Sequence, residues 1–440
     1  MTTRPFRSLL PALLQLLAAV VLIAVGAGWD QVGWVAYRAP WLPVAAIASV
    51  LLAILIVALR RRYWLALLLP ALLAIWLNTG WWASHAWQRQ QVLRADPALA
   101  QSIGRHFIVG YTDAAELDLL IERGLIGGVF LTKRNLVGLD AAGITRLTTH
   151  WQTLSQQHGY GPLLIATDQE GGIVARLSPP LPKQPPLGRL LAAGGDTALI
   201  ANTYGKEQGS GLQALGINLN FAPVVDLDHG VDNPDDRYSR ISSRALASDP
   251  ATVVRAADAY CAALASYRVR CTLKHFPGLG RVFEDTHADS ATITTPLAEL
   301  QRSDLLPFQT LMQRPDIAVM LTHARLAALD ATYPVSSSTA VVQQLLRQQW
   351  HFNGLLVTDD LSMAAAREQA GGLPLAVRRS LNAGVDVQLV SWDPALYYPL
   401  LAALIEDARS GRLDTAALQQ STQRLTRMAG GRPVVLPAAR

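Results

Sequence analysis

The sequence contains very little cysteine and lacks the usual spacings of metal ligands. Cys261 and Cys271 are the only two cysteines among the 440 residues, which is too few for a disulfide framework or a cysteine-based metal cluster. Both are interpreted as small buried residues, and a disulfide between them stays open because sequence spacing alone cannot establish one. No His-Glu-x-x-His or His-x-His pattern occurs, so no metal and no cofactor are predicted.

Acidic residues are nearly absent from the first 100 residues, where eight arginines stand against Asp30 and Asp96, a net charge of +6. Subtracting these from the chain totals of 38 basic and 33 acidic residues leaves 30 and 31 for the rest, a net charge of −1. The basic excess therefore belongs to the first segment. It gives no argument for a nucleic-acid partner.

Three long apolar stretches fill the same segment: Leu9 to about Gly28, Trp41 to Leu59, and Tyr63 to about Gly80. Each approaches the roughly 20 residues that a helix needs to cross a bilayer core. Eight of the eleven tryptophans also fall here, mostly near the ends of the stretches, as in interfacial belts. We predict a membrane anchor of three transmembrane helices over residues 1–82 and a helical connector over residues 83–101. Buried helices of a soluble protein, or a cleavable signal peptide in the first stretch, are the alternatives.

The distribution of arginine predicts the orientation of this anchor. Arg4 and Arg7 precede the first stretch and residues 60–62 are three consecutive arginines, whereas the first connection contains only Arg38. Short loops rich in Lys and Arg stay in the cytoplasm, so the amino terminus is predicted to be cytoplasmic. Three crossings then place the chain after about residue 83 outside. The prediction is a multi-pass protein of the cytoplasmic membrane with an extracytoplasmic main domain.

From residue 102 to 440, short apolar runs alternate with longer helical patterns, which is typical of repeated βαβ units. The eight runs are His106–Gly110, Gly127–Leu131, Leu163–Thr167, Leu219–Val224, Cys271–His275, Ala318–Thr322, Gly354–Thr358 and Val385–Val390. Eight parallel strands predict an α/β domain with a closed (β/α)8 TIM barrel. An open, doubly wound sheet is the alternative, because sequence periodicity does not report closure.

Polar residues occur at or just after the ends of five of these runs, where catalytic groups gather in such barrels. They are Asp168 with Gln169 and Glu170, then Asp226, Lys274 with His275, His323, and Asp359 with Asp360. Any one of them alone would serve equally well as a cap or a buried structural group. Agreement among five strands favours a shared pocket. Cleavage of a sugar linkage needs an attacking carboxylate and a group that donates and accepts a proton, and both kinds of residue are present.

Three longer motifs lie in this part of the chain. They are Asp168-Gln-Glu-Gly-Gly, Lys274-His-Phe-Pro-Gly-Leu-Gly-Arg-Val-Phe-Glu-Asp285-Thr-His287 and Val357-Thr-Asp359-Asp-Leu-Ser-Met363. From about residue 103 to 428 the sequence resembles glycoside hydrolase family 3, specifically its β-N-acetylglucosaminidases. The resemblance implies a retaining double displacement with Asp359 as nucleophile, His287 as acid/base and Asp285 as its partner. Histidine suits that role because it titrates near neutral pH and a nearby carboxylate can orient the ring.

The resemblance also implies which residues bind the sugar. The hydroxyls and acetamido group of a non-reducing N-acetylglucosamine would be bound by Asp168, Arg176, Arg244, Lys274 and His275. Asp226 and His323 would either touch the sugar or support a neighbour, and Asp360 would be structural, for example as a helix cap. The chain departs from the family's Lys-His-Phe-Pro-Gly-His-Gly-Asp-Thr at Leu279, Arg281 and Val282, which puts in doubt the resting conformation and leaving-group preference of the loop that carries the dyad.

The predicted activity is hydrolysis of terminal β-linked N-acetylglucosamine, and the extracytoplasmic location favours peptidoglycan or its muropeptides as the glycan. A family 3 glycosidase or phosphorylase of other sugar specificity is an alternative, since a histidine acid/base is compatible with phosphate as the second nucleophile. A catalytically idle glycan-binding barrel is another. A transporter is disfavoured because the apolar stretches contain no charge to line a path.

Overall fold

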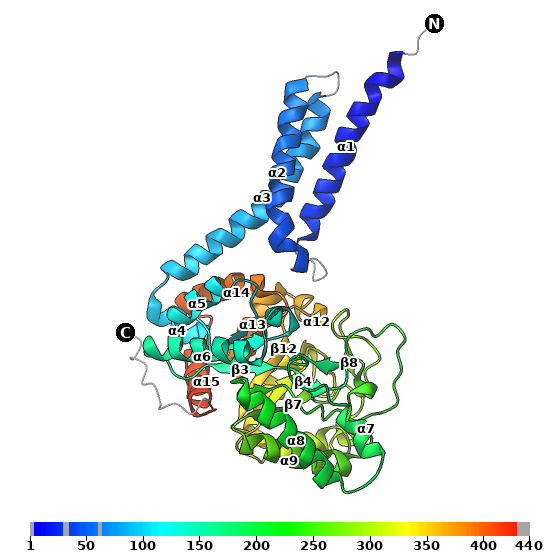
Figure 1. Cartoon of the computed structure of the whole chain (residues 1–440), viewed down its shortest axis with the longest axis vertical. Coiled ribbons are helices and arrows are strands. Elements are labelled where there is room, and N and C mark those ends of the chain that lie inside the picture. The colour runs from blue at the N-terminus through cyan, green and yellow to red at the C-terminus, as the bar shows by residue number, and fades with distance from the viewer. Residues whose placement is uncertain (1–3, 30–34, 60–63, 429–440) are drawn as a thin grey trace. The chain divides into compact units, whose positions relative to one another are not determined.

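The structure is a computed structural model that describes residues 4–29, 35–59 and 64–428. Arg60, Arg61 and Arg62, on which part of the orientation argument rests, lie outside the described residues, and so do residues 429–440 at the end of the predicted barrel domain. The chain divides into two compact units, Met1–Arg94 and Ala95–Arg440 (Figure 1). Each unit is described by itself.

The first unit consists of the helices α1 (Arg4–Gly28), α2 (Val35–Leu59) and α3 (Trp64–Arg94). All three are long and apolar enough to cross a membrane, which agrees with the three helices predicted from the apolar stretches. Helix α3 does not end with the third apolar stretch. It continues to Arg94, through most of the segment predicted as a connector.

Small residues fill part of the interior of this helical unit, and many of its large apolar side chains face outward. Ala71 and Ala74 are fully buried, whereas Leu69 is 71% exposed. Close contacts through small residues are typical of helices that pack in lipid. Asn78 is also buried, and it accepts a hydrogen bond from Trp29 Nε1 at 2.8 Å. The outer surface therefore suits a hydrocarbon environment, while the polar groups inside are satisfied by other helices.

The second unit is a closed barrel of eight parallel strands. In chain order these are β1 (Phe107–Val109), β2 (Gly128–Leu131), β3 (Leu164–Thr167), β6 (Leu219–Asn220), β7 (Arg270–Phe276), β9 (Ala318–Leu321), β12 (Leu355–Asp360) and β13 (Val387–Val390). The last strand pairs with the first, with Phe107 opposite Gln388. The predicted TIM barrel is confirmed, and the open sheet is wrong because the two outer strands of such a sheet pair here.

The strands are connected and flanked by helices, and several short elements decorate the loops. The longer helices are α4 (Pro97–Gly104), α5 (Ala114–Glu122), α6 (Ala141–Gln157), α8 (Thr197–Ala214), α9 (Pro250–Ser266), α11 (Leu305–Leu311), the π-helix η5 (Ala340–Gln349), α13 (Gly372–Ala383), α14 (Tyr397–Arg409) and α15 (Thr415–Met428). The short helices are α7 (Leu187–Ala192), α10 (Leu297–Leu300), α12 (Ala364–Arg367), η2 (Lys133–Leu136), η3 (Ile241–Ser243), η4 (Val335–Ser337) and η6 (Pro394–Leu396). The short strands are β4 (Gln169–Gly171), β5 (Val174–Ala175), β8 (Thr292–Ile293), β10 (Arg325–Leu326) and β11 (Asp330–Pro334).

Aspartates determine where several of the outer helices begin. Asp113 precedes α5, Asp140 precedes α6 and Asp196 precedes α8, and each side chain accepts a hydrogen bond from a backbone N–H of the first turn. These N–H groups have no partner within the helix, so the aspartate satisfies them. The alternation of strand and capped helix therefore follows from local sequence.

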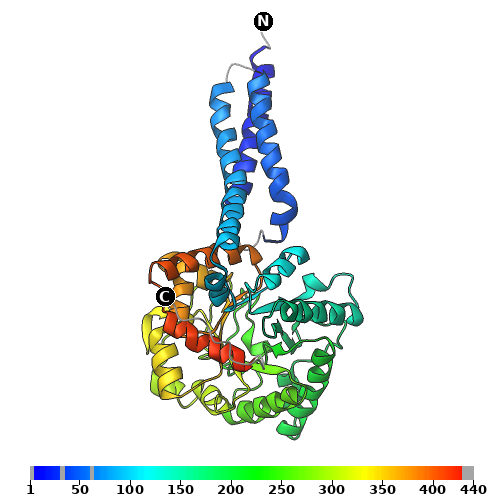
Figure 2. The same ribbon diagram turned by 90° about the vertical axis from the view of Figure 1, so that its left-hand side faces the viewer.

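The interior of the barrel is filled by apolar side chains that the strands direct inward. Phe130 and Phe221 stack there with ring centroids 5.8 Å apart. Leu425 and Met428 of α15, the red helix in Figure 2, belong to the same buried cluster. Because strand residues supply the rest of that cluster, α15 contributes to closing the barrel interior. Catalytic groups are therefore confined to the rim rather than a central channel.

Cys261 in α9 and Cys271 in β7 form a disulfide with their Cα atoms 5.5 Å apart. Both residues are buried, as predicted. The pairing, which the sequence left open, follows from the packing of α9 against β7. This bond connects α9 to the strand that carries Lys274 and His275.

Candidate active site

Asp359 lies near the end of β12, at the carboxyl-end rim of the barrel. Its Oδ1 accepts a hydrogen bond from the backbone N–H of Asp360 at 2.8 Å. Burial opposes ionisation of the carboxyl, but the charges of His275, His323 and His287 outweigh it and hold the pKa of Asp359 below its ordinary value. The side chain is therefore an ionised carboxylate at neutral pH, which is the form that can attack an electrophilic carbon.

Asp285 and His287 lie on the loop that follows β7, and their side chains are in contact. Asp285 Oδ1 is 2.9 Å from His287 Nδ1 and accepts the backbone N–H of His287 at 3.1 Å. Burial would raise the pKa of Asp285, yet hydrogen bonds from His287 and the charge of its ring lower it well below the usual range. The imidazole itself is 40% exposed. The structure thus brings the predicted pair together, with the ring open to solvent.

The loop that carries this pair is also connected to the strand that carries Asp359. The backbone N–H of Ala364, the first residue of α12, donates a hydrogen bond to the carbonyl of His287 at 3.1 Å. From the end of β9, which lies between β7 and β12, His323 Nε2 is 3.1 Å from the carbonyl oxygen of Asp359. Burial lowers the pKa of His323, although the charges of Asp359 and Asp360 oppose this. His323 therefore contacts the backbone at Asp359 from a buried position.

Four of the predicted sugar-binding residues form one buried cluster. Lys274 Nζ lies 2.8 Å from Asp168 Oδ1 and 2.5 Å from Glu170 Oε1. Arg244 bonds to both carboxylate oxygens of Glu170, at 2.9 and 2.7 Å. Its Nη2 is also 3.4 Å from His275 Nε2. Strands β3 and β7 and the loop after β6 supply these groups, so the closure of the barrel is what gathers them.

Asp226 supports this cluster from within the barrel. It is completely buried, and its Oδ2 lies 2.7 Å from His275 Nδ1. Its Oδ1 accepts the backbone N–H groups of His275 and Leu279 at 2.9 Å each. Of the two roles expected for Asp226, these contacts match support of a neighbour. The carboxylate fixes the imidazole and the start of the loop that leads to the dyad.

Glu170 is the residue of this cluster that sequence reasoning missed as a site residue. Burial would raise its pKa, but Arg244 and Lys274 lower the pKa of Glu170 to about 2. Its place after the third strand and inside the Asp168-Gln-Glu-Gly-Gly motif were the signals in the sequence, but neither assigned it a contact. The pairing of its carboxylate with Lys274 of β7 and Arg244 of the loop after β6 exists only in the folded chain.

Arg176 lies after the short hairpin formed by β4 and β5. Its backbone N–H donates to the carbonyl of Asp168 at 3.0 Å, which brings the two residues together. Its guanidinium is partly exposed and makes no hydrogen bond or ion pair with any residue that the structure describes. The structure therefore places Arg176 beside the cluster without joining its side chain to it.

Asp360 bridges two loops of the rim. Its Oδ1 accepts the backbone N–H of Ser362 at 2.7 Å, and its Oδ2 accepts those of Ser391 and Trp392 at 2.9 Å each. The residue is structural, as expected. It is not a helix cap, however, because it connects the loops after β12 and β13.

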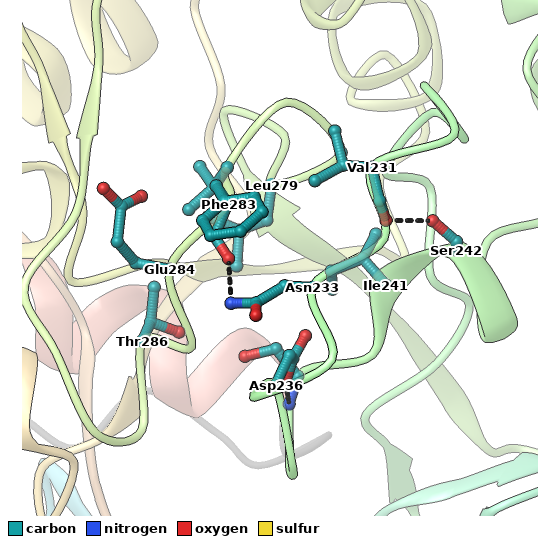
Figure 3. Close-up of a pocket in the computed structure, with 12 residues that line it drawn as sticks. Val231, Asn233, Asp236, Ile241, Ser242, Leu279, Phe283, Glu284 and Thr286 are labelled. Carbon is teal, nitrogen blue, oxygen red and sulfur yellow. Dashed lines mark hydrogen bonds between the residues drawn. The ribbon is translucent and has the colours of Figure 1, made fainter.

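The three departures from the family motif are well packed in this chain. Leu279 is 3% exposed and belongs to a cluster with Ile241, against which Val282 also packs. Arg281 Nε donates to Asp304 Oδ2 at 2.9 Å. Figure 3 shows the small pocket that remains between this loop and the loop after β6. The substituted residues thus attach the start of the dyad loop to its surroundings.

Comparison with known proteins identifies the family. Residues 98–428 match the family described as Glycosyl hydrolase family 3 N terminal domain. Beta-hexosaminidase LpqI of Mycobacterium tuberculosis is 35% identical over 334 residues, which cover 74% of this chain and 81% of that protein. A Beta-hexosaminidase of Stenotrophomonas maltophilia is 37% identical over 310 residues, which cover 69% of this chain and 86% of its own length.

Solved structures show the same barrel. A family 3 beta-N-acetylglucosaminidase from a Paenibacillus species has a TM-score of 0.68 and 29% sequence identity, over 77% of this chain and 64% of that chain. The family match, over residues 98–428, includes the eight strands of the barrel and every residue of the cluster around Glu170. The chain therefore belongs to glycosyl hydrolase family 3 and is a glycoside hydrolase.

Proposed function

We propose that the protein is a retaining β-N-acetylhexosaminidase that removes terminal β-linked N-acetylglucosamine through a covalent intermediate on Asp359. One observation carries the proposal. An ionised carboxylate on β12 and an exposed imidazole paired with Asp285 belong to one rim, and the charge of His287 is close enough to lower the pKa of Asp359. A nucleophile and a proton donor at one site are what a double displacement needs.

In the first step, a carboxylate oxygen of Asp359 attacks the anomeric carbon and the bond to the leaving-group oxygen breaks. His287 gives its Nε2 proton to that oxygen, because Nδ1 is engaged by Asp285. The products are a glycosyl-Asp359 ester and a neutral alcohol, and His287 is left without that proton. The carboxylate of Asp285 holds the ring orientation and stabilises its charged form before transfer.

In the second step, His287 acts as base. It takes a proton from a water molecule, whose oxygen attacks the anomeric carbon and displaces Asp359. Two inversions at the same carbon retain the β configuration. His287 and Asp359 are then back in their starting forms, ready for another cycle.

Recognition of the sugar is assigned to the cluster around Glu170. Lys274 and Arg244 present donors and Asp168 presents an acceptor at the rim, which suits the hydroxyls and the acetamido group of an N-acetylated sugar. Arg176, whose guanidinium has no partner among the described residues, supplies a further donor. The names of the similar proteins, beta-hexosaminidase and beta-N-acetylglucosaminidase, support the same donor sugar.

We also propose that the barrel lies outside the cytoplasmic membrane and acts on peptidoglycan or its muropeptides. Three helices able to span a membrane precede the barrel. The disulfide between Cys261 and Cys271 supports this side, because such bonds persist in oxidising compartments. A reporter fused to the carboxyl terminus tests the location. Activity of a reporter that works only in the cytoplasm would show that the carboxyl terminus is cytoplasmic and would overturn the proposed location.

The central experiment measures release of a chromogenic aglycone from aryl β-N-acetylglucosaminides by the full-length protein in detergent. The wild-type protein should be active. On a substrate with a poor leaving group, Asp359→Ala and His287→Ala should show no activity. A fluorinated substrate analogue that slows the second step should add one sugar to the peptide containing Asp359, as seen by mass spectrometry. An inactive wild type would sink the proposal, and a glycosyl phosphate formed only with added phosphate would replace hydrolysis by phosphorolysis.

A further inference from the structure

Ser239, in the loop after β6, contacts both the sugar-binding cluster and the acid/base pair. Its hydroxyl donates to Asp285 Oδ1 at 3.0 Å and lies 3.3 Å from His287 Nδ1. Its carbonyl accepts a hydrogen bond from Arg244 Nη1 at 2.7 Å. The residue is 5% exposed, so solvent does not compete for these contacts. One buried serine therefore connects a guanidinium that belongs to the sugar site with the carboxylate that orients the proton donor.

We propose that Ser239 is a positioning residue of this enzyme, which couples Arg244 at the sugar site to the orientation of His287. This inference rests on the proposed function. A sugar that binds Arg244 changes the position of the guanidinium that donates to the Ser239 carbonyl. The Ser239 hydroxyl, in turn, orients Asp285 Oδ1 toward the imidazole of His287. Ser239 contacts Asp285 and the Nδ1 side of the His287 ring, not the Nε2 atom that carries the transferred proton, and so acts by orienting the pair.

The turn that contains Ser239 is held by the carboxylate of Asp236. Oδ1 of Asp236 accepts the backbone N–H of Ser239 at 2.8 Å, and Oδ2 accepts that of Arg240 at 2.7 Å. Arg240 has a φ of 43°, in the left-handed region that few residues other than glycine adopt. A backbone held in this way does not change conformation easily, so the Ser239 hydroxyl stays directed at the dyad.

The same loop is also joined to the dyad loop farther from His287. Asn233 Nδ2 donates to the carbonyl of Phe283 at 2.7 Å, the contact drawn with a dashed line in Figure 3. Leu279 and Ile241 pack together beside it. The two loops therefore form one packed unit around the small pocket of Figure 3. Ser239 is the point where this unit reaches the acid/base pair.

Backbone contacts, rather than Ser239, hold the Asp285 carboxylate in place. Its Oδ2 accepts the N–H groups of Arg237 and Tyr238, at 3.2 Å each. Its Oδ1 is shared by the Ser239 hydroxyl, the His287 ring and the His287 backbone. Loss of the hydroxyl thus leaves Asp285 bound but less well oriented. We expect proton transfer to suffer, with little change in folding or in sugar binding.

The two chemical steps allow a sharp test, because they depend on His287 in different ways. Release of a poor leaving group needs a proton, whereas a dinitrophenolate leaves without one. With dinitrophenyl substrates kcat/KM therefore reports attack by Asp359, while kcat reports hydrolysis of the glycosyl-enzyme, for which His287 is the base. A defect in positioning changes these parameters differently from a general structural defect.

The experiment compares Ser239→Ala and Ser239→Val with Ser239→Thr, which keeps the hydroxyl, in the full-length protein. The matched control is Ser242→Ala, which removes a serine hydroxyl from the same loop that donates to the Val231 carbonyl at 2.9 Å (Figure 3). For phenyl substrates, Ala and Val should lower kcat/KM roughly tenfold, the usual effect of losing a hydrogen bond to a charged group. For dinitrophenyl substrates kcat/KM should stay within about twofold while kcat and KM fall together. The Thr and Ser242 variants should resemble wild type.

Equal losses for both leaving groups, or an effect of Ser239→Ala no larger than that of Ser242→Ala, would overturn the positioning role. If Ser239→Ala does not fold, the test uses the Thr and Val variants. The ratio of kcat/KM for the phenyl substrate to kcat/KM for the dinitrophenyl substrate should fall in the Val variant and stay near the wild-type value in the Thr variant. Wild-type and Asp359→Ala activities are measured in parallel. An inactive wild type would remove the proposed function itself, whereas an active wild type with unaffected Ser239 variants would remove only this inference.

Discussion

Asp386 is buried at the amino end of the barrel, and each of its two carboxylate oxygens accepts two hydrogen bonds. Its Oδ1 accepts from Ser421 Oγ and Arg424 Nε at 2.7 Å each. Its Oδ2 accepts from Arg347 Nη2 at 2.6 Å and from the N–H of Leu356 at 2.7 Å. These contacts tie the starts of β12 and β13 to the last helix. Both oxygens of Asp386 are satisfied, although Arg347 Nε is buried without a hydrogen-bond partner among the described residues. A buried network of this kind stabilises one fold.

At the carboxyl end, similar charged groups are partly exposed and can still form hydrogen bonds. His287 is 40% exposed and the side chain of Asp168 is 21% exposed. Arg176 has no side-chain partner within the described part of the chain. The difference between the two ends is therefore not the kind of residue but whether its hydrogen bonds are already made. Groups left unsatisfied at a rim are available to a polyhydroxylated ligand.

The largest expected effect separates two aspartates on neighbouring strands. Asp359→Asn should lower kcat by about 10⁴-fold or more, because the nucleophile is lost. Its melting temperature should fall only slightly, because the unfavourable burial of the Asp359 charge offsets much of its attraction to the nearby histidines. Enzyme assays and calorimetry on the same samples check this. Activity near that of wild type would contradict the assignment of Asp359.

Asp386→Asn should show the reverse pattern. Removing this charge leaves Arg347 and Arg424 buried without their counterion, which costs about 3–5 kcal/mol of unfolding free energy. The melting temperature should fall by several degrees, while kcat per folded molecule stays close to that of wild type. A normal melting temperature with reduced kcat would show that the comparison between the two ends is wrong.

His106, beside Asp386, makes the amino end sensitive to pH. Burial lowers the pKa of His106 from 6.5 to about 4, although the Asp386 carbonyl and charge oppose this. Between these values the unfolded chain binds more protons than the folded one, so stability falls as the pH falls from 6.5 toward 4. The maximum loss is about 3 kcal/mol.

Melting temperatures measured against pH at constant ionic strength check this effect, with His106→Gln as the control. The variant should have a shallower dependence in this window. Glu170 contributes little in this window. Its pKa is lowered from 4.5 to about 2 in the folded chain, so the stability that it provides is lost only as the pH falls from 4.5 through about 2. Parallel curves for wild type and variant would contradict the prediction.

The smallest effect is expected at Arg281, a departure from the family motif that attaches the dyad loop to Asp304. Its side chain is 28% exposed, so Arg281→Ala should cost no more than about 1 kcal/mol of stability. Activity on poor leaving groups should fall a few-fold, because the loop that carries His287 loses one attachment. Arg314→Ala, which breaks ion pairs with Asp316 and Asp258, is the control. Equal activity of both variants would show that Arg281 has no role in the loop.

Local sequence was sufficient for the elements and for the ends of the strands. All eight strands were predicted, because buried parallel strands read as short apolar runs between helical patterns. Asp285 and His287 were paired from the family resemblance, and their short spacing on one loop makes the contact easy to form. Part of the helical connector predicted over residues 83–101 is the polar end of α3, which continues without a break from the third apolar stretch to Arg94.

Contacts between distant segments could not be predicted. Glu170 with Arg244, Ser239 with Asp285, and Cys261 with Cys271 join residues whose neighbours in sequence carry no sign of the pairing. Asp386 is an aspartate next to a strand, as Asp168 is, yet it lies at the opposite end of the barrel because it precedes β13. Position along the strand, not residue type, separates the two.

The sequence by itself determined the alternation of strand and helix, the three apolar helices and the residue types available for chemistry, because these depend on periodicity and local spacing. Only the tertiary structure decided that the sheet closes and which charges are satisfied. It also decided that Ser239 connects Arg244 to the pair formed by Asp285 and His287. Such properties depend on where the backbone brings distant side chains together, and no local pattern encodes that distance.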